Sequence, residues 1–247
     1  MFSLCIPTMD RYDSFLITNL PKYLSNKRIN EIVISDENGN DVKKIQKDFP
    51  NNDKLKLFVN TERLGPFLNK INACKKAKNE WIVLMDSDNF ADEDYFNTVY
   101  NYLQTKIVSN RCILAPCWAK PNFNYSHLSG MVFKKGNFNM IKKKELNMDK
   151  KYKNSQVLMN TGNYVINKYL IDNLNLDNER KYLKYSHSCD VIYMNTLFFE
   201  QINDMEMHVL KDLHYSHVVH AGSVYKEYSN EFRKFNNFIY NRYNLLQ

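Results

Sequence analysis

Short apolar runs that alternate with helix-like stretches occupy the first 90 residues of this 247-residue chain. A short apolar run bounded by polar residues indicates a strand covered on both faces, because a strand with one solvated face alternates apolar and polar residues. The expected strands are SLCIP (3–7), EIVIS (31–35), LKLFVN (55–60) and WIVLM (81–85). Strands that alternate with helices predict an α/β fold, with a mostly parallel central sheet flanked by helices.

Helices are expected between these strands and after the last one. Their expected extents are residues 14–24, 42–47, 64–79 and 89–103. Right-handed crossovers bring the carboxyl ends of parallel strands to one edge of the sheet, so polar residues at those ends should converge there. The residues expected to converge are Thr8, Asp10, Arg11, Asp36, Asp86 and Asp88.

The strand at residues 81–85 runs into Asp86 and Asp88, in the sequence EWIVLMDSDN. With one residue between them, both carboxylates reach a single divalent cation if the chain turns at Ser87, and Mg²⁺ and Mn²⁺ prefer oxygen ligands. The alternative is that Asp88 caps the following helix, whose start is rich in acidic residues.

Phosphate recognition by a glycine-rich loop is not expected. No GxGxxG follows the first strand and no GxxxxGK[ST] occurs, so a phosphate would be held in another way, for which a divalent cation would serve. Two interpretations of Asp36 remain open. It accepts hydrogen bonds from a ribose or base edge, or it is a turn residue before Asn38 and Gly39.

Four stretches share a likeness to one family: SLCIPTMDR, VISDENG, NTERLGPFLNKINACKKAKNEWIVLMDSDN and TGNYVINKYLI. Their order and spacing resemble the A-type fold of nucleotide-sugar glycosyltransferases, and within it the inverting group known as family 2. Members typically have an Arg-Asn-x-Gly helix before the Asp-x-Asp strand. This chain departs from that pattern, with Lys70, Ile71 and Ala73 in place of Arg, Asn and Gly.

The resemblance implies a metal-dependent glycosyltransferase of the hexosyltransferase type. It would move a sugar from a nucleotide-diphosphate donor such as a UDP-sugar to a glycan or other hydroxyl acceptor, with inversion. Mn²⁺ or Mg²⁺ at Asp86 and Asp88 would stabilise the charge on the departing diphosphate. In TGNYV, Thr161, Gly162 and Asn163 would approach the donor closely, because glycine lacks a side chain. The donor-binding residues implied are Thr8, Arg11, Asp36, Lys70, Asp86, Gly162, Asn163 and Lys226.

An inverting transfer needs a carboxylate that takes the proton of the acceptor hydroxyl. Asp190 is the expected base, since polar residues precede an apolar helix in YSHSCDVIYMNTLFFEQ, much as the family places its base at a helix start. Alternatively, Asp190 only favours the helix dipole, and Glu200 or Asp172 is the base.

Four histidines lie close together in MHVLKDLHYSHVVHAGSVY. Zinc is not expected, because this spacing on an extended segment does not direct the rings to one point and no HExxH motif accompanies them. The A-type fold often supplies a later histidine as an additional metal ligand, and HAGS resembles that place. His220 is therefore the expected ligand, with His217 as the alternative. Lys226 or Arg233 would steady the departing diphosphate.

From Ala115 the pattern changes to shorter, mixed elements. We expect a donor-binding half at residues 1–114 and an acceptor-binding half with a C-terminal helix at residues 115–247, joined in one globular unit. Aromatic side chains in the second half stack on sugar rings or pack in the core. The candidates are Trp118, Phe123 and Tyr125.

The formal charge of +7 attracts anions, and two other functions compete with the one above. A nucleic-acid-binding protein would need a basic stripe with interleaved aromatic residues, but the dense basic run at residues 142–153 is interrupted by acids and indicates a solvated loop. A nucleotidyltransferase would have a glycine- and lysine-rich loop where this chain has TMDRYDS. Five cysteines without a CxxC pair, no signal peptide and no long apolar stretch favour a cytoplasmic protein without a transmembrane segment.

Overall fold

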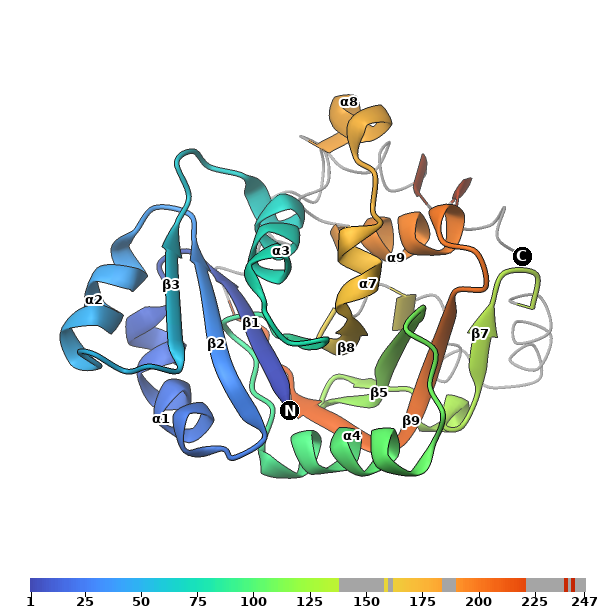
Figure 1. Cartoon of the computed structure of the whole chain (residues 1–247), viewed down its shortest axis with the longest axis horizontal. Helices are drawn as coiled ribbons and strands as arrows, with labels where there is room; N and C mark the ends of the chain where they lie inside the picture. Colours follow the sequence, from blue (N-terminus) through green and yellow to red (C-terminus); the bar gives the residue numbers. More distant parts are fainter. Residues whose placement is uncertain (138–157, 160–161, 184–189, 221–237, 240, 243–247) are drawn as a thin grey trace.

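The computed structural model describes residues 1–137, 158–159, 162–183, 190–220, 238–239 and 241–242 of the chain. Within these ranges the chain forms one mixed sheet with helices on both faces (Figure 1). The expected fold class, an α/β fold with a parallel first half and a mixed second half, is confirmed. None of the helices in these ranges is long and apolar enough to cross a membrane.

The first four strands lie where the apolar runs predict them. They are β1 (Phe2–Thr8), β2 (Ile29–Asp36), β3 (Leu55–Val59) and β4 (Trp81–Leu84). They pair in parallel in the order β3, β2, β1, β4, and the register places Thr8 beside Asp36. All seven residues of β1 are buried, as a strand covered on both faces requires. The carboxyl ends therefore meet at one edge of the sheet.

The four expected helices of this half also form. They are α1 (Ile17–Ser25), α2 (Asn40–Asp48), α3 (Gly65–Lys76) and α4 (Glu93–Thr105). The helix expected from residue 14 begins instead as a π-helical turn, η1 (Tyr12–Leu16), a form that is frequent at functional sites. The expected helix at residues 64–79 ends earlier, because Ala77 is extended.

Strands of the second half continue the same sheet. They are β5 (Cys112–Lys120), β6 (Phe123–Asn124), β7 (Val132–Lys134), β8 (Tyr164–Asn167) and β9 (Glu206–Ser216). β8 lies antiparallel between β4 and β5, and β9 pairs in parallel with β5 and antiparallel with β7. The expected division after residue 114 falls within β5, so the two expected halves share one sheet.

The helices pack on both faces of this sheet. Helical segments described in the second half are η2 (Ser126–Leu128), α7 (Lys168–Asp172), η4 (Asp177–Glu179), α8 (Arg180–Leu183) and α9 (Asp190–Gln201). Figure 1 shows α3, α7 and α9 on one side of the sheet and α4 on the other, where α4 contacts β9. Because α3 contacts both α7 and α9, it joins the first half of the chain to the second.

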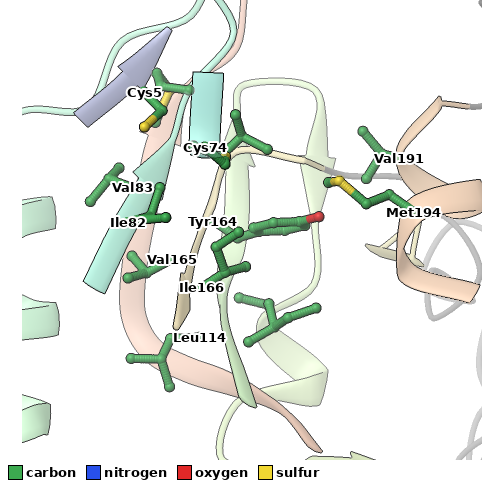
Figure 2. Close-up of a cluster of buried hydrophobic side chains, with 14 of the residues drawn as sticks. Cys5, Cys74, Ile82, Val83, Leu114, Tyr164, Val165, Ile166, Val191 and Met194 are labelled. Carbon is green, nitrogen blue, oxygen red and sulfur yellow. The ribbon is translucent and has the colours of Figure 1, made fainter. Parts of the chain in front are cut away.

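Figure 2 shows buried hydrophobic side chains packed around the middle of the sheet. They come from β1, β4, β5 and β8 and from the helices α3 and α9, and they line both faces of the sheet, because neighbouring residues of a strand point to opposite faces. The hydroxyl of Tyr164 in this core donates to Oδ1 of Asn195 at 2.9 Å, so its polar atom is satisfied. The cysteines within the described ranges are buried, free thiols: Cys5, Cys74, Cys112 and Cys117.

Candidate functional site

The end of β4 places Asp86 and Asp88 at the shared edge of the sheet. The backbone N–H of Asn89 donates to the carbonyl of Asp86 at 3.0 Å, so the chain turns between the two carboxylates. The helix-cap interpretation of Asp88 is wrong. The cap of α4 is Asp92, whose carboxylate accepts from the backbone N–H of Tyr95 at 3.0 Å.

A buried lysine joins Asp86 to the start of α9. Nζ of Lys70 lies 2.7 Å from Oδ1 of Asp86 and 2.6 Å from Oδ2 of Asp190, and Lys70 is only 7% exposed. Burial opposes the charge of Lys70, but Asp190 and Asp86 outweigh it and raise the pKa of the ammonium above its ordinary value. Lys70 is therefore a fixed internal cation between two carboxylates.

Asn163 fixes the other side of Asp86. Its Oδ1 accepts from the backbone N–H of Asp86 at 2.7 Å, and its Nδ2 donates to Oδ2 of Asp86 at 3.1 Å. The hydroxyl of Tyr95 donates to the carbonyl of Asn163 at 3.1 Å. Since Lys70 contacts one carboxylate oxygen of Asp86 and Asn163 the other, the orientation of this side chain is set from both sides.

Gly162 has a packing role. A Cβ at this position would lie 2.4 Å from Cγ2 of Val191, at the start of α9. The absence of a side chain thus lets the chain before β8 approach α9, which is a sufficient reason for glycine here. An approach to a donor stays a prediction for Gly162 and Asn163, and Thr161 lies outside the described residues.

Asp88 faces His220 across the site. Nε2 of His220 lies 3.0 Å from Oδ2 of Asp88, and each side chain is 22% exposed. Burial and the charge of Asp86 raise the pKa of Asp88, and His220 offsets only part of this effect. The ring of Phe15, from η1, lies 5.2 Å from that of His220. Asp88 therefore combines a poorly compensated charge with a neighbouring imidazole.

The chain after β9 is held along the loop that follows Asp88. We call residues 216–220 the histidine segment. Ser216 and Phe90 exchange backbone hydrogen bonds of 2.8 and 3.0 Å, and the N–H of Val218 donates to Oδ1 of Asn89 at 2.9 Å. These bonds bring both candidate histidines to the end of β4. Burial lowers the pKa of His217 below its ordinary value, and the charges of Asp88 and Asp86 offset only part of this effect.

The loops after β1 and β2 are joined by a residue that the sequence analysis did not single out. The buried carboxylate of Asp41 accepts from the Thr8 hydroxyl at 2.5 Å and from the backbone N–H groups of Arg11 and Tyr12 at 3.0 and 2.9 Å. Its position at the start of the expected second helix was the available signal. Thr8 is buried in this contact, whereas Arg11 remains partly exposed.

Asp36 is completely buried at the end of β2. Its carboxylate accepts from the backbone N–H groups of Asn38 and Val42 at 3.2 and 2.9 Å. These contacts fit the turn interpretation, because they shape the loop that leads into α2. A role of Asp36 at a nucleoside stays a prediction.

Of the three candidate bases, Asp190 is the one that contacts Lys70, the partner of Asp86, among the residues that the structure describes. It begins α9 and binds Lys70, and burial raises its pKa while Lys70 opposes this rise. Glu200 lies near the other end of α9 and binds Nε of Arg242 at 3.0 Å. Asp172 lies on α7 and binds Lys168 at 3.2 Å.

Several predicted residues lie outside the described residues, namely Lys226, Arg233 and the basic run at residues 142–153. Within the part of the chain that the structure covers, no three His, Cys, Asp or Glu side chains form a group that could hold a metal ion.

Comparisons with known proteins give one family. The model of glycosyl transferase family 2 matches residues 3–172, and no curated protein matches the chain. The structure is similar to S. aureus TarS 1-349 in complex with UDP-GlcNAc, with 14% identity and a TM-score of 0.66 over 98% of this chain and 66% of that one. The same TarS region in complex with UDP gives 14% identity and a TM-score of 0.60, over 92% of this chain and 62% of that one.

A third TarS 1-349 structure gives 15% identity and a TM-score of 0.59, over 87% of this chain and 59% of that chain. At such identities the likeness shows the fold. The chain also spans less than two thirds of the length of these TarS chains.

Proposed function

We propose that the chain, which belongs to glycosyl transferase family 2, is a glycosyltransferase that moves a sugar from a UDP-sugar to an acceptor hydroxyl with inversion. The observation that carries the proposal is the arrangement of Asp86, Asp88, Lys70, Asp190 and His220 at the carboxyl edge of the sheet. The ligands of the similar TarS structures, UDP-GlcNAc and UDP, support a nucleotide-sugar donor.

Asp88 and His220 are the residues that would hold a Mn²⁺ or Mg²⁺ ion. A carboxylate fits both cations, an imidazole fits the softer Mn²⁺ better than Mg²⁺, and the raised pKa of Asp88, which burial and Asp86 cause, fits a carboxylate that needs a counter-charge. Asp86 is less able than Asp88 to bind such an ion, since Lys70 and Asn163 already contact its two carboxylate oxygens. A bound ion would supply charge neutralisation for the diphosphate, whose oxygens and water would complete its ligand shell.

The loops after β1 and β2 would receive the nucleotide. Asp41 holds the backbone from Thr8 to Tyr12 in place, and Asp36 shapes the loop into α2. Arg11 would line this pocket from the first loop. Lys70 would act on the donor indirectly, because its ammonium fixes the orientation of Asp86.

Asp190 would act as the base. It would take the proton of the acceptor hydroxyl while the acceptor oxygen attacks the sugar carbon from the face opposite the diphosphate. The bond from the sugar carbon to the phosphate oxygen breaks, and UDP leaves with that electron pair. Burial raises the pKa of Asp190 above its ordinary value although Lys70 opposes the rise, and a raised pKa makes the carboxylate a stronger base.

Thermal shift in the presence of nucleotide sugars tests donor binding. UDP, UDP-GlcNAc and other nucleotide sugars should stabilise the protein when Mn²⁺ is present. Ligand at 100 times its Kd adds about 2.7 kcal/mol, which corresponds to a rise in Tm of roughly 5–10 °C for a chain of this size. Asp88→Ala should lose the Mn²⁺-dependent part of the shift.

The matched control is Asp94→Ala, since Asp94 is an exposed acid in the first turn of α4 and should leave the shift unchanged. Absence of stabilisation by every nucleotide sugar contradicts the proposal. A full shift in Asp88→Ala contradicts the metal role. A larger shift with nucleoside triphosphates than with nucleotide sugars favours a nucleotidyltransferase.

The role of Asp190 is tested by Asp190→Asn. This variant should lose transfer while its thermal shift with UDP and Mn²⁺ persists, because the amide cannot accept the proton but keeps the side-chain shape. Retained turnover would move the search to Glu200 or Asp172, although neither contacts Asp86 or Lys70 in the residues described.

A further inference from the structure

Exposed apolar side chains lie at or beside the histidine segment, whose His220 contacts Asp88. Large hydrophobic residues are exposed at seven positions of the described chain, and three of these, Phe123, Val218 and Val219, are 38%, 38% and 53% exposed at or beside the histidine segment. Single exposed hydrophobic residues are ordinary, whereas a group of them beside a site indicates a binding surface.

Phe123 and His217 form the wall of this surface. Their ring centroids lie 5.3 Å apart with an interplanar angle of 56°. Phe123 comes from β6, just beyond the turn after β5, and the N–H of His217 donates to the carbonyl of Lys120 at 2.7 Å. The two rings are therefore brought together by the ends of β5 and β9.

Asn122 fixes the orientation of His217. Its Nδ2 donates to Nδ1 of His217 at 2.8 Å and to the His217 carbonyl at 3.1 Å. Because Nδ1 accepts a hydrogen bond, the proton of the neutral imidazole is on Nε2. His217 thus offers an N–H donor beside the apolar ring of Phe123.

The other two aromatic candidates for sugar stacking do not join this wall. Phe123 pairs with Ala119 of β5, so these two side chains point to the same face of the sheet. Trp118 precedes Ala119 in the strand and therefore points to the opposite face. Tyr125 is completely buried. Of the three candidates, Phe123 is the one with an exposed ring on the His217 side.

The position in the sheet separates this wall from the expected nucleotide pocket. Along the sheet the order is β3, β2, β1, β4, β8, β5, β9. The loops proposed to receive the nucleotide follow β1 and β2, and the carboxylates follow β4. Phe123 and His217 follow β5 and β9, on the far side of the carboxylates, which leaves this side for the second substrate.

We propose that Phe123 and His217 form an acceptor subsite that receives the ring face of a pyranose sugar. This inference rests on the proposed function. A pyranose carries C–H groups on its ring faces and hydroxyls at its edge, so one partly exposed aromatic ring with an adjacent N–H donor matches it. His220 of the same segment contacts Asp88, so a donor whose diphosphate is held at Asp88 would have its sugar near a hydroxyl of that ring.

The test measures UDP release from UDP-GlcNAc, or from the UDP-sugar that gives the largest thermal shift, with and without added acceptor probes. The probes are methyl glycopyranosides of glucose, galactose and N-acetylglucosamine, with sorbitol as an acyclic polyol that has no ring face. Pyranosides should stimulate UDP release and sorbitol should not. Phe123→Ala should raise the KM for the stimulating pyranoside at least about tenfold, as expected when one apolar ring contact is lost.

Phe123→Tyr should retain the stimulation, because it keeps the ring. The control Ile107→Ala removes an exposed hydrophobic residue beyond the end of α4 and should change nothing. Equal stimulation by sorbitol, an unchanged KM in Phe123→Ala, or UDP release that no pyranoside stimulates would each overturn the subsite. If no UDP-sugar binds or is cleaved, the proposed function itself fails, and the thermal shift with UDP and Mn²⁺ shows whether each variant is folded.

Discussion

Lys70→Met removes a positive charge from between two carboxylates while it nearly preserves the length of the side chain. Removing one partner of a buried ion pair costs about 3–5 kcal/mol, because the remaining charge stays buried without compensation. The side chains of Asp190 and Asp86 are 14% and 29% exposed, so water relieves Asp86 more and the cost should lie near the lower end. A loss of about 3 kcal/mol lowers the Tm of a chain of this size by roughly 6–12 °C.

Thermal melts and urea titrations at pH 7.5 measure this loss. The double variant Lys70→Met/Asp190→Asn should recover part of it, because one uncompensated charge is removed as well. Lys44→Met serves as the control, since Lys44 pairs with Asp13 at the exposed surface and should hardly change the Tm. A Tm of Lys70→Met within about 2 °C of the unmodified protein would refute the buried-cation argument.

Two further predictions concern packing and pH. Gly162→Ala should lose about 1–3 kcal/mol of stability in urea titrations, because its Cβ would meet Val191 at 2.4 Å. Val191→Ala should recover much of this loss, and additive losses in the double variant would contradict the clash. Burial alone would raise the pKa of Glu206, but Lys134 and His208 together lower it by more. The pKa of Glu206 is therefore lower in the folded protein than in the unfolded chain. Glu206 therefore stabilises the protein above the unfolded pKa, about 4.3, and this contribution disappears as pH falls through the folded pKa. Glu206→Gln should lower the Tm at pH 7 and much less at pH 3, and an equal loss at both pH values would contradict the linkage.

The first half of the fold follows closely from the sequence because its strands are short apolar runs with polar ends. Parallel pairing and right-handed crossovers then leave little choice in where those ends meet. The sequence therefore predicts that Asp86 and Asp88 lie at the sheet edge. The residue that caps α4 could not be predicted equally well, since Asp88 and Asp92 are both acids near the helix start and only the backbone path selects Asp92.

The partners within the site depend on contacts that no local pattern encodes. Lys70 and Asp190 are 120 residues apart in the chain, and each stands on a helix whose position depends on the packing of the whole core. The resemblance placed Lys70 at the donor without indicating its contact with Asp190. The role of Asp41 is not evident from the sequence, because an acid in the first turn of a helix has an ordinary explanation, whereas the contacts of Asp41 come from the end of β1 and the loop after it.

The place of β8 in the sheet bears on how the chain folds during synthesis. β4 borders β1 on one side and β8 on the other, yet β5 is synthesised before β8. Until residue 167 has left the ribosome, the edge of β4 therefore lacks its second neighbour and exposes unpaired backbone groups. Such long-range pairing slows folding, and a nascent fragment that ends at residue 114 should need a chaperone rather than fold into an independent unit.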